Sequence, residues 1–219
     1  MVNRDEITDL FGAQLRRFMH ENFQSTEQIG EAISQTAAVT RRLFELLLET
    51  GAQAGSSAKI FYDYPGFNLK YGTMIFKLSF LSDADIFAFV GVKLTTNDPT
   101  TDMTESHAGM MFEDGSVYFS TADGFNQQKV KIADVDPTNN IIYKIEYNRM
   151  RWKPLPIQYP YFDGFRYEPA FRDWSLGQTN SSYPPTNADH YFLAYIRNTT
   201  GANKKLYIRN ITYGEIYAD

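Results

Sequence analysis

The chain has 219 residues, of which 43% are hydrophobic and 16% aromatic, so it is long enough to bury a sizeable core. Its formal net charge of −5 argues against a nucleic-acid binder, because such proteins usually carry a basic surface. The absence of cysteine excludes disulfides and thiolate metal sites. Residues 1–11 lack the apolar core of a signal peptide, and no apolar run is long enough to cross a membrane.

The N-terminal fifty residues are expected to form two helices. Apolar residues recur at helical spacing between residues 4 and 23, and acidic residues stand in the first turn. A second helix is expected from Ser25 or Thr26, either of which suits an N-cap, to about Thr50. Gly51 then provides the helix stop.

The second helix carries a heptad-like seam. The oligomerisation positions that it predicts are Ile29, Thr36, Val39, Leu43 and Leu46. One interpretation is a helical hairpin that packs on its own β domain. The other is a short stem that forms a homo-oligomer, for which a trimer is favoured because the whole plan resembles a fibre.

Residues 51–57 have the Gly, Ser and Ala composition of a flexible linker. They give the one domain boundary that the sequence suggests. The expected division is therefore a helical stem at 1–50, a linker at 51–57 and a β domain at 58–219.

The chain becomes rich in β signals after residue 58. Strands are expected at 59–64, 73–81, 85–94, 128–132, 141–147, 191–197 and 205–217. Asp114 and Gly115 lie between two further short strands and predict a hairpin with a type I′ turn. The fold class is thus mainly β, an antiparallel jelly-roll sandwich preceded by an α-helical segment.

Two long connections attract functional interest. Residues 95–107 form a polar loop in which Asp98, Asp102 and Glu105 offer oxygen ligands for a Ca²⁺ ion, although a solvated acidic loop has the same composition. Residues 148–190 hold both tryptophans and most prolines. The glycan- or partner-binding candidates there are Trp152, Tyr159, Tyr161, Phe165, Tyr167 and Trp174, whose rings stack on sugars or pack onto the sandwich.

Two segments carry a family resemblance. AGMMFEDGSVYFSTADG from residue 108, with VKIADVDPTNNIIYKIEY after it, and HYFLAYIRNTTGANKKLYIRNITYGEIY from residue 190 resemble the concanavalin A-like lectin and glucanase sandwich. The resemblance covers about residues 58–217 and implies a carbohydrate-binding fold. The paired-glutamate strand motif of the family's glucanases is missing, since Glu113 and Glu146 each stand without a partner at the required spacing.

The expected function is non-enzymatic, with no catalytic residues and no obligatory cofactor. The overall plan is similar to phage and archaeal-virus head-fibre or decoration proteins. It implies a virion-type structural or adhesion protein whose partners are copies of itself, a capsid protein and a surface glycan. The virion is then the expected location. The alternative is a carbohydrate-binding module or a degenerate glucanase-like protein; nucleic-acid binding and membrane insertion are not expected.

Overall fold

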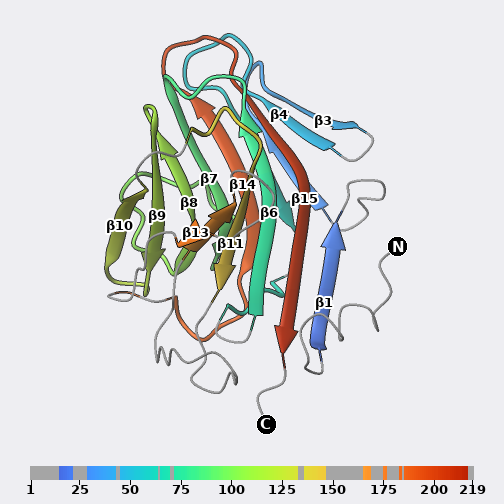
Figure 1. The fold of residues 1–219 in the computed structure, drawn as a ribbon. Helices are drawn as coiled ribbons and strands as arrows, with labels where there is room; N and C mark the ends of the chain where they lie inside the picture. The colour runs from blue at the N-terminus through green and yellow to red at the C-terminus, as the bar shows by residue number, and fades with distance from the viewer. Residues whose placement is uncertain are drawn as a thin grey trace.

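The computed structural model describes most of the β-rich part of the chain. The described residues are 15–21, 29–42, 45–63, 65–69, 72–132, 136–146, 165–168, 175–176, 183 and 185–216. They form two antiparallel sheets that face each other as the two layers of a sandwich (Figure 1). No helix among these residues is long and apolar enough to span a membrane.

Sheet A contains eight described strands, in the order β13-β12-β11-β6-β15-β4-β3, with β1 also paired to β15. Their bounds are β1 (Leu15–Glu21), β3 (Ala38–Arg42), β4 (Glu45–Glu49), β6 (Gly72–Phe80), β11 (Ile141–Glu146), β12 (Phe165–Glu168), β13 (Ser175–Leu176) and β15 (Lys205–Ile216). Strand β15 pairs along most of its length with β6, and the two run side by side in Figure 1.

Sheet B contains seven described strands in the order β10-β9-β8-β7-β14-β5-β2. Their bounds are β2 (Ile29–Ile33), β5 (Ser57–Tyr62), β7 (Ile86–Lys93), β8 (His107–Glu113), β9 (Ser116–Ala122), β10 (Gln127–Ile132) and β14 (Tyr191–Asn198). Every residue of β7 is buried, as expected for a central strand that is covered on both faces.

The main core fills the space between the two sheets. Alternate residues of each strand point into it, among them Phe76, Val90, Met110, Phe119, Phe192 and Tyr213, all with 0% exposure. Phe112 packs edge-on against Tyr143 with ring centroids 6.1 Å apart, and this contact joins β8 of sheet B to β11 of sheet A. The aromatic richness of the sequence is thus used largely for packing between the sheets.

The predicted β-sandwich is confirmed, including the hairpin between β8 and β9. Asp114 and Gly115 have φ values of 43° and 77°, which are the left-handed conformations that a type I′ turn requires. Asp and Gly tolerate this region better than most residues. The turn sequence therefore fixes the register in which Glu113 lies opposite Ser116.

The helical prediction for residues 25–50 is wrong where the structure describes them. Strand β2 pairs with β5 of sheet B, whereas β3 and β4 form a hairpin that joins sheet A through β15. Of the first predicted helix, residues 15–21 form strand β1, and residues 4–14 lie outside the described part. A short apolar run such as Leu46 to Leu48 has no decisive periodicity, so pairing with β15 decided its conformation.

The seam predicted for oligomerisation is likewise not formed as predicted. Leu46 is fully buried in the sandwich core, and Val39 packs partly against that core from β3. Thr36 lies in the turn between β2 and β3, Ile29 begins β2, and Leu43 lies outside the described residues. Ile29 and Leu46 belong to different sheets, so the described positions do not form one helical stripe. A homo-oligomer stays a prediction without this seam.

The predicted flexible linker is a turn held tightly to the sandwich. The buried side chain of Asn198 accepts a hydrogen bond from the amide of Gly55 at 2.9 Å and donates to Gly51 O at 3.0 Å. Gly51 and Gly55 have φ values of 70° and 80°, so these glycines supply the left-handed conformations of a turn and not the flexibility of a linker. The structure therefore places residues 29–42 and 45–49 in the same sandwich as the rest, and not in a separate stem.

Candidate functional site

The outer face of sheet B, which points away from the main core, carries a second layer of side chains. Its centre is a cluster of buried apolar residues: Phe87, Phe89, Met103, Met111, Leu193 and Tyr195, with Tyr118 packed against them. Met103 does not belong to a strand. It comes from loop 94–106, which connects β7 to β8 and lies over this face.

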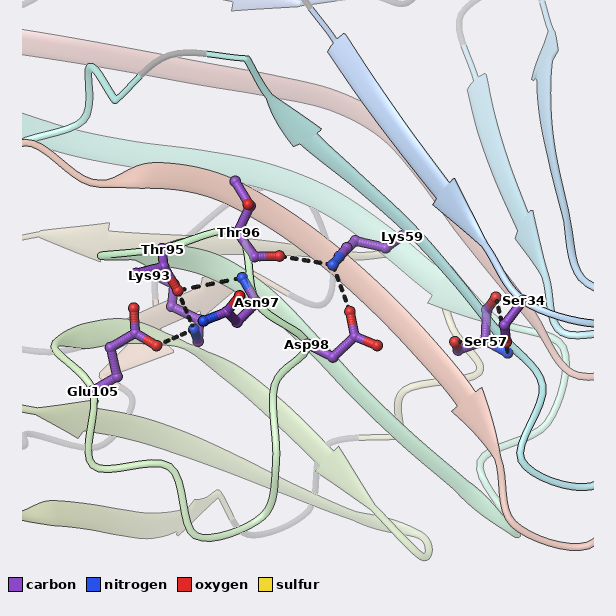
Figure 2. A network of polar contacts seen from close by, with 9 residues as sticks. All are labelled: Ser34, Ser57, Lys59, Lys93, Thr95, Thr96, Asn97, Asp98 and Glu105. Carbon is purple, nitrogen blue, oxygen red and sulfur yellow. Dashed lines mark hydrogen bonds and ion pairs between the residues drawn. The ribbon is translucent and has the colours of Figure 1, made fainter.

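Loop 94–106 is fastened to the sheet first through Lys93 at the end of β7. The side chain of Lys93 is only 2% exposed, and its ammonium group forms an ion pair with Glu105 and donates to Thr95 Oγ1 at 3.1 Å (Figure 2). Burial raises the pKa of Glu105, but the hydrogen bonds from Lys93 and Thr95 and the charge of Lys93 together outweigh this effect and hold the pKa below its usual value. The start and the end of the loop thus meet at one ammonium group.

The second attachment is Lys59 on β5, two strands away from β7 in the sheet. Its ammonium group donates to Thr96 O at 2.7 Å and pairs with the Asp98 carboxylate (Figure 2). Lys59 is 10% exposed at its side chain, whereas Asp98 is 55% exposed. The lysine is therefore part of the covered surface, and the carboxylate borders on solvent.

A histidine–serine pair lies at the end of the loop. His107 Nδ1 is 2.7 Å from Glu105 O, a group that only accepts, so Nδ1 carries the proton and Nε2 accepts from Ser120 Oγ at 2.8 Å. Gln127 Nε2 donates to the same serine oxygen at 3.1 Å. Burial lowers the pKa of His107 to about 4, so the ring is neutral at pH 7.

A second histidine–serine pair, His190 with Ser106, has the same arrangement, and Ser106 directly precedes His107 in the chain. His190 Nδ1 donates to Ala188 O at 2.7 Å, and its Nε2 accepts from Ser106 Oγ at 2.8 Å. Ser106 Oγ also accepts from the amide and the hydroxyl of Thr186. Both histidines and both serines are at most 1% exposed. Each pair resembles a catalytic nucleophile with its general base. Because both pairs are buried, we assign them a structural role: they attach the end of loop 94–106 to Ser120 and to residues 186–190.

The turn 123–126 lies beside the loop, because Ala122 pairs with His107 across β8 and β9. Asp123 Oδ1 accepts the amide protons of Phe125 and Asn126 at 2.9 and 2.8 Å, which lowers the pKa of Asp123 and makes the turn rigid. Phe125 is 84% exposed, more than any other large hydrophobic side chain in the described residues. An aromatic ring is thus presented to solvent on a fixed turn.

Another part of this face lies over β9 and β10, where Lys131 is exposed and Tyr118 is half-buried. The half-buried ring of Tyr118 has Lys129 Nζ 5.5 Å from its centroid, and the same ammonium group pairs with Glu113 at 3.1 Å. Glu113 and Glu105, the two glutamates on or above this face, are therefore both engaged by a lysine.

The predicted calcium ligands are not brought together. Asp98 and Glu105 turn to different lysines, and Asp102 is exposed with a hydrogen bond from the Thr101 hydroxyl. The described residues contain no group of three or more His, Cys, Asp or Glu side chains that could hold a metal ion. The carboxylates of Asp98 and Glu105 thus bind lysine ammonium groups, and not the Ca²⁺ ion that the sequence suggested.

The predicted aromatic candidates are only partly placed. Phe165 and Tyr167 belong to β12 near the edge of sheet A, so they come from the other sheet than the face described above. Trp152, Tyr159, Tyr161 and Trp174 lie outside the described residues. Sequence reasoning missed Phe125, Lys59 and Lys93. Only Phe125, an aromatic residue inside the turn signal Asp-Gly-Phe-Asn, had a visible cue.

The chain is similar to known proteins in structure but not in sequence. No protein-family model matches the chain, and no curated protein is similar to it in sequence. The β-glucanase of Bacillus licheniformis is similar with a TM-score of 0.58 and 12% identity, over 91% of this chain and 99% of that one.

Two further solved structures have the same arrangement. The exoplasmic/lumenal domain of VIP36, in a form bound to Ca²⁺ and Man3GlcNAc, has a TM-score of 0.63 and 10% identity over 94% of this chain and 92% of its own. The catalytic domain of a laminarinase from Thermotoga petrophila has a TM-score of 0.59 and 14% identity over 94% and 99%. These lectin and glucanase structures share the chain's two antiparallel sheets, so the protein has the concanavalin A-like jelly-roll fold.

Proposed function

We propose that this protein is a non-enzymatic carbohydrate-binding protein, which contacts its glycan at the end of sheet B where loop 94–106 and turn 123–126 meet. The observation that carries the proposal is the 84% exposed ring of Phe125 on a rigid turn. Aromatic rings that stay exposed on a fixed backbone suit stacking on the apolar face of a sugar. The fold shared with lectins and glucanases supports the same assignment.

The absence of catalysis is part of the proposal. Glycoside hydrolysis generally needs two carboxyl groups about 5–10 Å apart, one as acid and one as base or nucleophile. Glu105 and Glu113 are each paired with a lysine, so neither offers a free carboxyl group on this face. We therefore expect binding without turnover.

A virion-type structural or adhesion role, with a trimer and a capsid partner, stays a prediction. Its main motivation was a helical stem, and strands stand in place of the second predicted helix. Adhesion to a surface glycan is compatible with the proposed carbohydrate contact.

The test is a binding screen of the intact protein against immobilised neutral and acidic polysaccharides. Phe125→Ala should weaken binding about fivefold, the loss expected for one aromatic contact. Leu81→Ala, which removes a 58% exposed apolar side chain elsewhere, is the matched control and should bind normally. No binding to any polysaccharide, or release of reducing sugar by the wild-type protein, would contradict the proposal.

A further inference from the structure

The strands of sheet B present an excess of positive charge on their outer face. By register, the charged residues that point outward from the described strands are the cations Lys59, Lys93, Lys129, Lys131 and Arg197 and the single carboxylate Glu113. The whole chain has a net charge of −5, so this face has the opposite sign to the protein that carries it. Such a local surface attracts anions despite the overall charge.

Two of these lysines are covered by loop 94–106. Lys59 and Lys93 have side chains only 10% and 2% exposed, and lysine is rarely so buried without a partner. The partners are Asp98 and Glu105, both from the loop (Figure 2). The loop therefore supplies this face with the two carboxylates that its ammonium groups require.

We propose that loop 94–106 occupies a binding surface of sheet B, and that the ligand which displaces its Asp98 end is an acidic polysaccharide with carboxylate or sulfate groups. This inference rests on the proposed function, since it names the class of carbohydrate for the same outer face of sheet B. Asp98 is the exchangeable group, because it is 55% exposed while its lysine is covered. An anionic group of the ligand takes the place of the Asp98 carboxylate at Lys59.

The spacing of the lysines fits a polymer better than a single sugar. Lys59 pairs with Tyr195 and Lys93 with Tyr191, so the two lysines are separated by strand β14 and by four residues along it. Strand spacings of about 4.8 Å and rises of about 3.4 Å per residue put their Cα atoms roughly 17 Å apart. A polysaccharide with repeated acidic groups can place one anion at Lys59 and extend along this face towards Lys129, while Lys93 keeps its pair with Glu105.

The surface between the lysines suits the rest of such a ligand. Phe89 and Tyr195 lie there on the outer face, in the same cluster as Met103 of the loop. Gly91 and Gly109 face each other across β7 and β8 without side chains, and a Cβ at Gly109 would lie 2.5 Å from the Phe89 ring. Movement of the loop would therefore uncover flat aromatic surface between cationic groups, which matches the apolar faces and charged edges of an acidic sugar chain.

The experiment compares polygalacturonate with the neutral glucan laminarin by isothermal titration calorimetry on the intact protein. Wild type should bind polygalacturonate more tightly than laminarin, and 1 M NaCl should weaken only the former. Asp98→Asn should bind polygalacturonate about threefold more tightly, because an internal competitor for Lys59 is removed. Asp102→Asn changes the net charge equally in the same loop and should leave the affinity unchanged.

Lys59 provides the complementary test. Lys59→Gln should weaken polygalacturonate binding about tenfold, whereas Lys59→Arg, which keeps the charge, should restore most of it. Thermal melting of each variant verifies that it is folded, and the Arg variant keeps the test decisive if the Gln variant is unstable.

Three results would overturn the inference. Binding of laminarin but not polygalacturonate rejects the acidic ligand and leaves the proposed carbohydrate function standing. Failure to bind either polymer, or any in the wider screen, rejects both. Equal tightening by Asp98→Asn and Asp102→Asn means that only net charge attracts the polymer, and the loop is then not a competitor.

Discussion

Residues 50–56 and residues 94–106 are both connections rich in small and polar residues, and different forces hold them. The first turn is fastened by neutral hydrogen bonds from the Asn198 side chain, which contacts Thr50, Gly51 and Gly55. The second loop is fastened by two lysine–carboxylate pairs and by one apolar side chain, Met103. Composition alone does not distinguish these two cases.

The difference has a physical consequence. A buried amide bonded to backbone groups is directional and indifferent to salt, and its loss leaves polar groups unsatisfied. An ion pair with a half-exposed carboxylate is screened by salt and can exchange its anion for another one. The turn at 50–56 is therefore permanent structure, whereas the Asp98 end of loop 94–106 is replaceable.

Replacement of Asn198 by Ala should destabilise the protein by about 4 kcal/mol. Asn198 is fully buried, and the substitution removes three side-chain hydrogen bonds at once, those to Gly51 O and the Thr50 hydroxyl and that from the Gly55 amide. Urea denaturation at pH 7 measures the loss. Asn203→Ala is the control, since Asn203 is exposed and bonds to the Gly51 amide from outside, so it should cost less than about 1 kcal/mol. Equal costs would contradict the assignment of a permanent turn.

Acid should destabilise the protein by about 3 kcal/mol through His107 alone. The folded-state pKa of about 4 lies below the ordinary value of 6.5, so below pH 6.5 the unfolded chain binds a proton that the folded protein does not. Stability is therefore full above pH 6.5 and falls as the pH drops towards 4. The pKa of His190 is also lowered by burial, and it acts in the same direction.

The measurement is the free energy of unfolding between pH 7.5 and 4.5 for wild type and His107→Gln. The variant should show a shallower pH dependence, because it lacks the titrating ring while an amide can still bond to Ser120. An unchanged slope in the variant would show that His107 does not titrate as its burial implies.

Asp98→Asn should destabilise the protein by only about 0.5–1 kcal/mol at low salt, because Asp98 is half exposed and Lys59 keeps its bond to Thr96 O. The effect should disappear in 1 M NaCl, where the screening length is about 3 Å. Asp102→Asn, without a lysine partner in the described part of the chain, should be neutral at both salt concentrations. A loss of stability that persists in high salt would contradict this prediction, because it would show that the Asp98 contact is as insensitive to salt as the Asn198 hydrogen bonds.

The smallest expected effect is on local opening. Amide hydrogen exchange in loop 94–106 should accelerate about twofold in 1 M NaCl, whereas exchange at Gly51 and Gly55 should not change, since no ion pair holds those amides. Mass spectrometry of peptides from both regions measures this in one experiment. Equal acceleration in both regions would remove the distinction between them.

The sequence predicted the sandwich well after residue 57 and poorly before it. Alternating strands such as Ile141 to Glu146 and the Asp114-Gly115 turn are local signals, so they were identified correctly. The run Leu46 to Leu48 is buried on both sides in sheet A and has no alternation to identify it as a strand. The linker interpretation failed for a related reason, because the partner of Gly51 and Gly55 is Asn198, far away in the chain.

The candidate site was predicted less well than the fold. The sequence singled out loop 95–107, but it interpreted Asp98 and Glu105 as metal ligands. Their partners, Lys59 and Lys93, are 39 and 12 residues away and look like ordinary surface lysines. Nothing local shows that either lysine is buried, since this depends on which loop covers the strand.

The sequence by itself determined the class of this protein: a cysteine-free antiparallel sandwich with aromatic packing, because strand period and turn chemistry act over a few residues. Tertiary structure alone decided that strands β2, β3 and β4 join the two sheets and that one face of sheet B is cationic and covered by its own acidic loop. The physical reason is that strand pairing, burial of charge and the choice of ion-pair partner depend on segments far apart in the chain.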